Sequence, residues 1–258
     1  MKTFKQNLLN NQFTLGSWIT LYHPSIVELM APAGFEWLVV DIEHSVISLE
    51  QAQILILAIE RSGPTSLVRV GSNDSVEIKK VMDAGAGGVI VPMVNSAEEA
   101  VRAVKAVKYA PQGYRGVGLA RAQRWGMKWD EHLKWLKEEA VVIVMVEHIE
   151  GVRNLPQILE VEGVDGILVG PYDLSGSLGV PGQFDHPEFL KALSEIKTRC
   201  QAKKKALGIH VIEPEFQKVI EKKQEGFSFV AFSMDHRFLS RKCQEQMEAL
   251  NLKKAVKE

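Results

Sequence analysis

A chain of 258 residues with 46% apolar residues is long enough to bury one large core. Its 31 basic and 32 acidic residues are interspersed, which excludes a field that attracts nucleic acid or anionic lipid. Cys200 and Cys243 stand too far apart for a disulfide framework or a zinc-ligand spacing. The N-terminus lacks the apolar core of a signal peptide and no run reaches the roughly 20 residues that span a bilayer, so we expect a cytoplasmic protein.

Eight short apolar runs, several of them apolar on both faces, predict parallel strands covered by helices. They lie at residues 15–20, 35–41, 66–70, 88–93, 141–147, 165–170, 206–210 and 227–233. Stretches with helical spacing separate them, and one opens with a capping pattern of Ser96 and Glu99. Strand and helix alternating over about 250 residues predict a single domain, 1–258, of the α/β class with a TIM (β/α)8 barrel fold.

Two segments exceed what a barrel requires. Residues 110–140 form a long connection, which we expect to cross one rim of the barrel. Residues 236–258 have the pattern of a long amphipathic helix with a charged end, which we expect to pack on another subunit.

Polar residues gather where the predicted strands end. In a TIM barrel these carboxyl ends and the loops after them build the active site. The residues concerned are Asp41, Glu43, His44, Arg69, Glu147, Asp173, His210, Ser233 and Asp235. Their convergence predicts an active site at this end of the barrel.

Glu147 and Asp173 follow neighbouring strands, which lie about 4.8 Å apart in a sheet. Two carboxylates suit one hard cation, Mg²⁺ or Mn²⁺, with positions left for water and substrate. A closed zinc site is disfavoured because no cysteine or firm histidine pair is near. The alternative is that each acid only caps the helix after it.

Arg69 lies within an apolar strand, where a buried guanidinium requires an anionic partner. That partner is either structural, Asp41 or Glu43, or an anionic group of a substrate. His44 follows Asp41 closely enough for the carboxylate to orient it as a base. His210 stays unassigned.

The stretch GPYDLSGSLG has glycines at 170, 176 and 179, and its backbone N–H groups suit a carboxylate; the alternative is a plain glycine turn. No predicted strand contains a lysine, which argues against a Schiff-base aldolase mechanism.

Several motifs, taken in order, resemble one known family. DIEH, GAGGVIVPMVNSAEEA, YRGVGLARAQRW, VEHIEGVRNLPQIL and DGILVGPYDLSGSLG resemble the class II pyruvate aldolases of the HpcH/HpaI family, of the 4-hydroxy-2-oxoheptanedioate and 2-dehydro-3-deoxyglucarate aldolase type. The likeness runs from Leu15 to Asp235. It implies a TIM barrel whose last helix is exchanged between subunits, and a homohexamer built as a trimer of dimers.

The resemblance also implies roles for particular residues. A divalent ion, Mg²⁺, Mn²⁺ or Co²⁺, is held by Glu147 and Asp173, and catalysis uses His44, Arg69 and Asp41. The substrate is bound by Arg69, Gly170, Pro171, Tyr172 and Asp173. Ile42, Met145, Tyr172 and His210 depart from some members of the family, which leaves the aldehyde specificity open.

The implied reaction is reversible cleavage of a 4-hydroxy-2-oxo acid to pyruvate and an aldehyde through a metal-stabilised pyruvate enolate. The partners are therefore a small 2-oxo acid and an aldehyde. We expect the segment from Tyr114 to Trp125, with Arg115 and Arg121, to help select the aldehyde, either within its own subunit or across a subunit interface. The alternatives are an acyl-CoA lyase of the malyl-CoA or citramalyl-CoA type, an enzyme that processes phosphoenolpyruvate, and a non-catalytic barrel scaffold.

Overall fold

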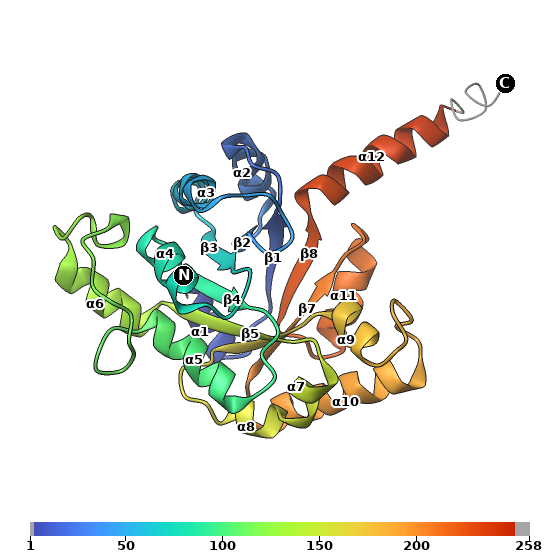
Figure 1. The fold of residues 1–258 in the computed structure, drawn as a ribbon. Coiled ribbons are helices and arrows are strands. Elements are labelled where there is room, and N and C mark those ends of the chain that lie inside the picture. The colour runs from blue at the N-terminus through green and yellow to red at the C-terminus, as the bar shows by residue number, and fades with distance from the viewer. Residues whose placement is uncertain (1–2, 251–258) are drawn as a thin grey trace.

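A closed barrel of eight parallel strands, in the order β1 to β8, forms the centre of the computed structural model, which describes residues 3–250 (Figure 1). The strands are β1 (Thr14–Ile19), β2 (Trp37–Asp41), β3 (Thr65–Arg69), β4 (Gly88–Val91), β5 (Val141–Val146), β6 (Gly166–Val169), β7 (Ala206–Val211) and β8 (Phe229–Met234). No strand boundary departs from the predicted one by more than two residues. The predicted TIM barrel is confirmed.

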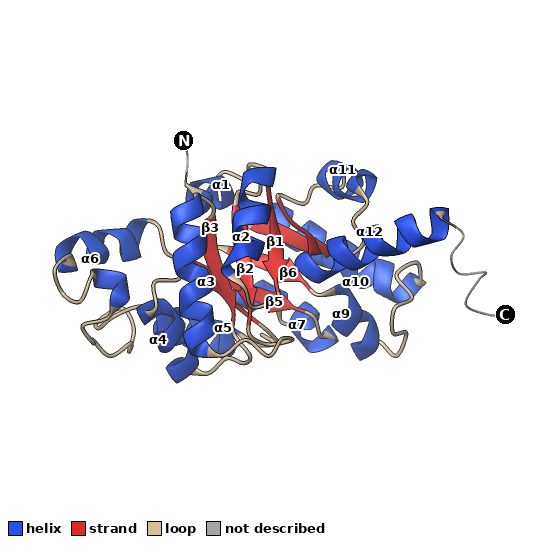
Figure 2. Ribbon diagram, turned by 90° about the horizontal axis from the view of Figure 1, so that it is seen from above, coloured by secondary structure: helices blue, strands red, loops and turns tan. Residues whose placement is uncertain are grey.

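Helices surround the barrel (Figure 2). They are α1 (Phe4–Leu9), α2 (Pro24–Met30), η1 (Ala31–Ala33), α3 (Leu49–Ser62), α4 (Ser75–Asp83), α5 (Ala97–Val107), η2 (Arg121–Gln123), α6 (Trp129–Glu138), α7 (Ile149–Arg153), α8 (Leu155–Leu159), α9 (Pro171–Ser177), α10 (Pro187–Ala202), α11 (Phe216–Gln224) and α12 (Asp235–Ala249). Ser96 caps α5 as predicted, its side chain accepting from the Glu99 N–H. His148 caps α7 by accepting from the Glu150 N–H.

The barrel has an inner and an outer core because alternate residues of each strand face opposite ways. The inner core is a separate cluster of buried side chains: Phe4, Leu8, Trp18, Trp37, Val39, Leu67, Ile90, Val141, Ile143, Met145, Leu168, Ala206, Phe229 and Ala231. Trp37 and Phe229 fill the lower lumen against Gly16 and Gly208, where a Cβ would collide with the rings. The short helix α1 closes the N-terminal end of the lumen with Phe4 and Leu8, which belong to this inner core.

The two long segments project from opposite sides of the barrel. α6 stands at one side and α12 at the other in both views (Figures 1 and 2). α12 is anchored by its first turns, where the Phe238 ring contacts Phe35 and Phe232. Farther along, Leu239, Met247 and Leu250 are exposed. The end of the predicted helix, residues 251–258, lies outside the described residues.

Within residues 3–250, no helix is both long enough and apolar enough to cross a membrane.

Candidate active site

Strand ends bring the predicted site residues together. Asp41 ends β2 and Arg69 ends β3, and the β2–β3 register sets them side by side. Glu147 follows β5 directly, and Asp173 lies in the first turn of α9, just after β6. The carboxyl ends of the strands therefore carry a cluster of charged side chains from β2, β3, the residue after β5, and α9, as the sequence predicts.

Asp41 and Arg69 form the most buried ion pair of this cluster. Arg69 Nε donates to Asp41 Oδ1 at 2.9 Å, and Nη2 donates to Oδ2 at 2.6 Å. The guanidinium also lies 4.3 Å above the Trp18 ring, and Nε is 3.3 Å from Glu43 Oε2. Both acids expected as structural partners of Arg69 are thus in contact with it, and these contacts fix the plane of the guanidinium.

Asp41 reaches His44 through the backbone. Its Oδ1 accepts from the N–H groups of Glu43 and His44, at 3.1 and 3.2 Å. The ring of His44 instead has its Nε2 3.7 Å from Glu43 Oε2, and 63% of the side chain is exposed. Asp41 therefore shapes the turn that carries His44, whereas the acid beside the imidazole is Glu43.

Glu147 is held in place by the backbone. Its side chain is buried, and Oε1 accepts from the Met93 N–H at 2.8 Å. Met93 has φ of 52°, a left-handed conformation that is uncommon for a residue with a side chain. Oε2 lies against Gly170, where any Cβ would collide with it. The glycine at 170 is therefore required by the carboxylate at 147.

The carboxylates near Glu147 exceed the cations that could neutralise them. Burial raises the pKa of Glu147 to about 7, and the neighbouring Glu43 and Asp173 add to the rise. Burial likewise raises the pKa of Glu43 to about 7 against the lowering effect of Arg69. Arg69 is the cation that acts on both groups. This electrostatic imbalance fits a site for a bound cation.

Asp173 is exposed and has no hydrogen bond or ion pair with any described residue. It does not cap α9, whose N-cap is Gly170, so the capping alternative does not account for it. Within residues 3–250, no group of three or more His, Cys, Asp or Glu side chains is placed to enclose a metal ion. A cation held by Glu147 and Asp173 would therefore keep open positions, as a catalytic ion needs.

Comparison with known proteins assigns the family. The model of the HpcH/HpaI aldolase/citrate lyase family matches residues 14–241. The chain is 38% identical over 241 residues to the 4-hydroxy-2-oxo-heptane-1,7-dioate aldolase of Escherichia coli, which covers 93% of this chain and 91% of the relative. The chain belongs to the HpcH/HpaI aldolase/citrate lyase family.

Solved structures agree with this assignment. A family protein from Burkholderia cenocepacia superposes with a TM-score of 0.90 at 28% identity, covering 96% of this chain and 98% of that one. The HpcH/HpaI aldolase from Desulfitobacterium hafniense gives a TM-score of 0.88 at 27% identity, with 97% of both chains covered. The resemblance read from the motifs is confirmed, and the chain is an enzyme of the aldolase-type lyases.

Within one subunit, Arg115 and Arg121 lie away from the charged cluster, so a role in selecting the aldehyde would have to act across a subunit interface. The buried Arg115 pairs with Asp83 at 2.5 Å, and Arg121 donates to the Ala84 carbonyl at 2.8 Å and pairs with Glu60. These partners lie at the ends of α3 and α4, where the chain returns to the N-terminal ends of the strands. Within one subunit both arginines are structural.

His210 and Trp18 line the lumen just below the charged cluster. Their rings lie 5.5 Å apart, and Trp18 also contacts Arg69. Burial, followed by the nearby Arg69, lowers the pKa of His210 to about 3, so the imidazole is neutral. His210 is therefore a polar part of the site wall, an assignment that the sequence alone did not give.

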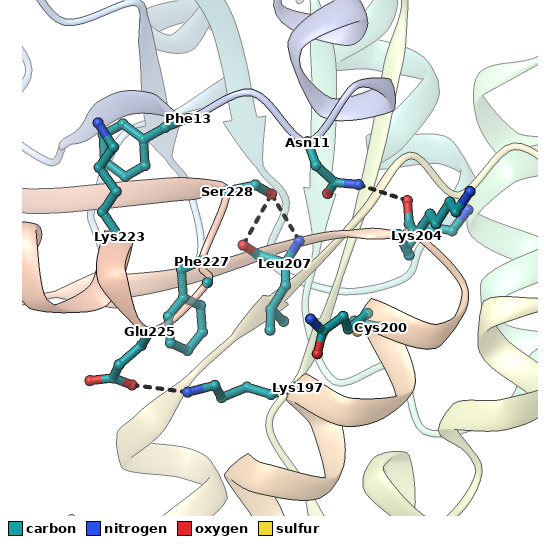
Figure 3. Close-up of a pocket in the computed structure, with 13 residues that line it drawn as sticks. Asn11, Phe13, Lys197, Cys200, Lys204, Leu207, Lys223, Glu225, Phe227 and Ser228 are labelled. Carbon is teal, nitrogen blue, oxygen red and sulfur yellow. Dashed lines mark hydrogen bonds and ion pairs between the residues drawn. The ribbon is translucent and has the colours of Figure 1, made fainter.

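A second hollow lies at the opposite end of the barrel (Figure 3). It has a volume of about 590 Å³ and is lined by the ends of α10 and α11 and the residues before β7 and β8. Lys197, one of its lysines, pairs with Glu225 at 3.4 Å. The hollow shares no residue with the charged cluster of the HpcH/HpaI site.

Proposed function

We propose that the chain is a divalent-metal-dependent class II aldolase that reversibly cleaves a 4-hydroxy-2-oxo acid to pyruvate and an aldehyde. The observation that carries the proposal is the pair of uncompensated carboxylates, Glu147 and Asp173, beside Arg69 at the carboxyl end of an aldolase-family barrel. The curated relative that is 38% identical is a 4-hydroxy-2-oxo-heptane-1,7-dioate aldolase, which agrees with this substrate class.

Glu147 and Asp173 would hold the ion, and their oxygen donors suit Mg²⁺ or Mn²⁺ better than a softer metal. When bound, such an ion supplies electrostatic stabilisation of negative charge on the 2-oxo acid. Glu147 is prepared for this role because its position is fixed by the Met93 N–H.

Arg69 would stabilise the charge that develops on the substrate oxygens. Asp41 takes the Nε–H and one N–H of Nη2, so the two N–H groups of Nη1 and the second of Nη2 would remain for the substrate. Because Asp41 fixes the guanidinium plane, these donors need little reorganisation during the reaction. The proposed role of Arg69 and the supporting role of Asp41 therefore both depend on the geometry of their buried ion pair.

His44 would move the proton of the substrate hydroxyl. In the cleavage direction the imidazole removes the proton from the C4 hydroxyl, and in the condensation direction it returns it. Asp41 supports this role by holding the backbone of His44. The backbone N–H groups after Gly170, at Tyr172 and Asp173, would bind the substrate carboxylate, and Pro171 at the first helical position contributes none.

The assembly and location belong to the same proposal. The exposed apolar side chains along α12 support exchange of this helix between subunits of a homohexamer. A cytoplasmic enzyme agrees with the two cysteines, neither of which forms a disulfide.

The test is pyruvate release from a 4-hydroxy-2-oxo acid, assayed before EDTA treatment, after it, and after addition of Mn²⁺ or Mg²⁺. We expect release that EDTA abolishes and the metal restores. Release that EDTA leaves unchanged would exclude the metal role. An absence of release, with cleavage of an acyl-CoA substrate instead, would move the chain to the acyl-CoA lyase alternative.

A further inference from the structure

Glu43 touches two residues to which the proposed reaction assigns chemistry. Its Oε2 lies 3.3 Å from Arg69 Nε and 3.7 Å from His44 Nε2. The side chain is 17% exposed, so the carboxylate sits at the edge of the site, between the buried arginine and the exposed imidazole. No other described carboxylate forms an ion pair with His44.

The Asp41 carboxylate bonds Arg69 and the backbone, and no bond from it reaches the ring of His44. Its Oδ1 accepts from Arg69 Nε and from the N–H groups of Glu43 and His44, and its Oδ2 accepts from Arg69 Nη2. Three of these four bonds fall on Oδ1, so Oδ1 has no lone pair to spare, whereas Oδ2 keeps one acceptor site. The carboxylate that contacts the imidazole is instead that of Glu43.

We propose that Glu43 is the positioning residue for His44, so that Nε2–H of the imidazole faces the Glu43 carboxylate and Nδ1 presents its lone pair to the substrate hydroxyl. The present separation of 3.7 Å is an ion-pair contact, longer than a hydrogen bond, and the exposed ring can rotate to shorten it. This inference rests on the proposed aldolase function and goes beyond it by naming the acid and the nitrogen.

The location of Glu43 favours this role over a purely structural one. Its backbone N–H is held by Asp41, which fixes the start of the side chain. Arg69 attracts its carboxylate from β3, while Asp41, Asp173 and Glu77 repel it from β2, α9 and α4. The carboxylate is thus oriented by its surroundings, and His44 is the mobile partner.

The test is a double-mutant cycle of Glu43→Gln and His44→Ala, with pyruvate release as the readout. Glu43→Gln keeps the shape and removes the charge, so we expect kcat to fall by about 10- to 100-fold, with KM for the substrate changed less than about twofold. In the His44→Ala background we expect the same substitution to have almost no effect, because Glu43 acts through His44. The acidic limb of the kcat profile should also move to lower pH in Glu43→Gln.

Glu77→Gln is the matched control. It removes a neighbouring charge of the same sign from α4, and its carboxylate bonds the Gly71 N–H at 2.8 Å without contacting His44. We expect its kcat and pH profile to match those of the unaltered chain. Glu43→Asp, which keeps the charge on a shorter side chain, should recover part of the lost activity and serves as the second variant if Glu43→Gln does not fold.

Four outcomes separate the positioning role of Glu43, the base role of His44 and the aldolase function. A loss on Glu43→Gln that is equally large in the His44→Ala background would overturn the positioning role, as would a Glu43→Gln variant with unchanged kcat. Unchanged turnover in His44→Ala alone would refute the base assigned under the proposed function. Absence of metal-dependent pyruvate release from the unaltered chain would refute the aldolase function itself.

Discussion

The two ends of the barrel differ in whether their buried charged side chains have partners of opposite charge. At the N-terminal end each buried charge has a partner: Lys5 pairs with Asp165 at 3.3 Å and Arg115 with Asp83 at 2.5 Å. At the C-terminal end Arg69 is shared between Asp41 and Glu43, while Glu147 has only a backbone N–H. Leaving a buried carboxylate without a cation is costly, so such an imbalance marks function rather than stability.

The largest expected effect comes from replacing the carboxylate at the C-terminal end. Glu147→Gln keeps the acceptor for the Met93 N–H and removes the charge. We expect kcat/KM for pyruvate release to fall by about 1000-fold or more, because a ligand of the catalytic ion is lost. The free energy of unfolding, measured in urea, should stay equal or rise, since a buried charge is removed.

If Glu147→Gln kept its activity and its Mn²⁺ affinity in calorimetry, the unpaired carboxylate at the C-terminal end would have no role in the reaction.

The matching substitution at the N-terminal end should have the opposite consequence. Asp165→Asn leaves Lys5 without its counter-charge, although Lys5 still donates to the Ala140 carbonyl at 2.7 Å. We expect the free energy of unfolding to fall by about 2–3 kcal/mol, somewhat less than for a fully isolated buried charge. Urea denaturation measures the loss, and kcat at a temperature where the variant is folded should stay within about twofold of the unaltered chain.

A variant that loses activity while keeping its stability would show that the N-terminal end takes part in the reaction.

Some features of the two ends of the barrel could be predicted from the sequence, and others could not. Asp41, Arg69, Glu147 and Asp173 could be placed at one end because strand ends are fixed by the eight apolar runs. The need for glycine at 170 could not be predicted, since it depends on the Glu147 side chain pointing at the residue after the adjacent strand β6. The spacing of residues in the sequence predicts where along a strand each residue lies, but not the direction in which its side chain points.

The contacts of Met93 and Glu43 are further features of the site that the sequence could not predict. The N–H that holds Glu147 comes from a residue with φ of 52°, and no local sequence pattern predicts that conformation for a methionine. Spacing also suggested that Asp41 orients His44, but it could not reveal that Asp41 bonds the backbone of His44 while Glu43 lies beside the ring. Likewise, the partners of Arg115 and Arg121 near the N-terminal ends of the strands could not be predicted, because chain order does not show which rim a loop crosses.

A smaller effect concerns the pH dependence of cation binding. The pKa values of Glu43 and Glu147 are raised to about 7, so these carboxyls are partly protonated near neutral pH. Because these pKa values are raised in the folded state, the two carboxyls contribute their full stabilisation below their ordinary pKa of 4.5. This stabilisation is lost as the pH rises to about 7. Because a cation binds the ionised form, we expect Mn²⁺ affinity to rise by about tenfold between pH 6 and pH 8.

Calorimetry in two buffers of different ionisation enthalpy would report the released protons, and an affinity independent of pH in this range would show that Glu147 does not hold the cation.

The most direct measurement is a crystal structure of the chain with Mn²⁺ and pyruvate. We expect an anomalous peak between the Glu147 and Asp173 carboxylates, with pyruvate beside it and within hydrogen-bonding distance of Arg69. Mn²⁺ bound elsewhere, or pyruvate bound away from the carboxyl ends of the strands, would contradict the assignment of the active site to this end of the barrel.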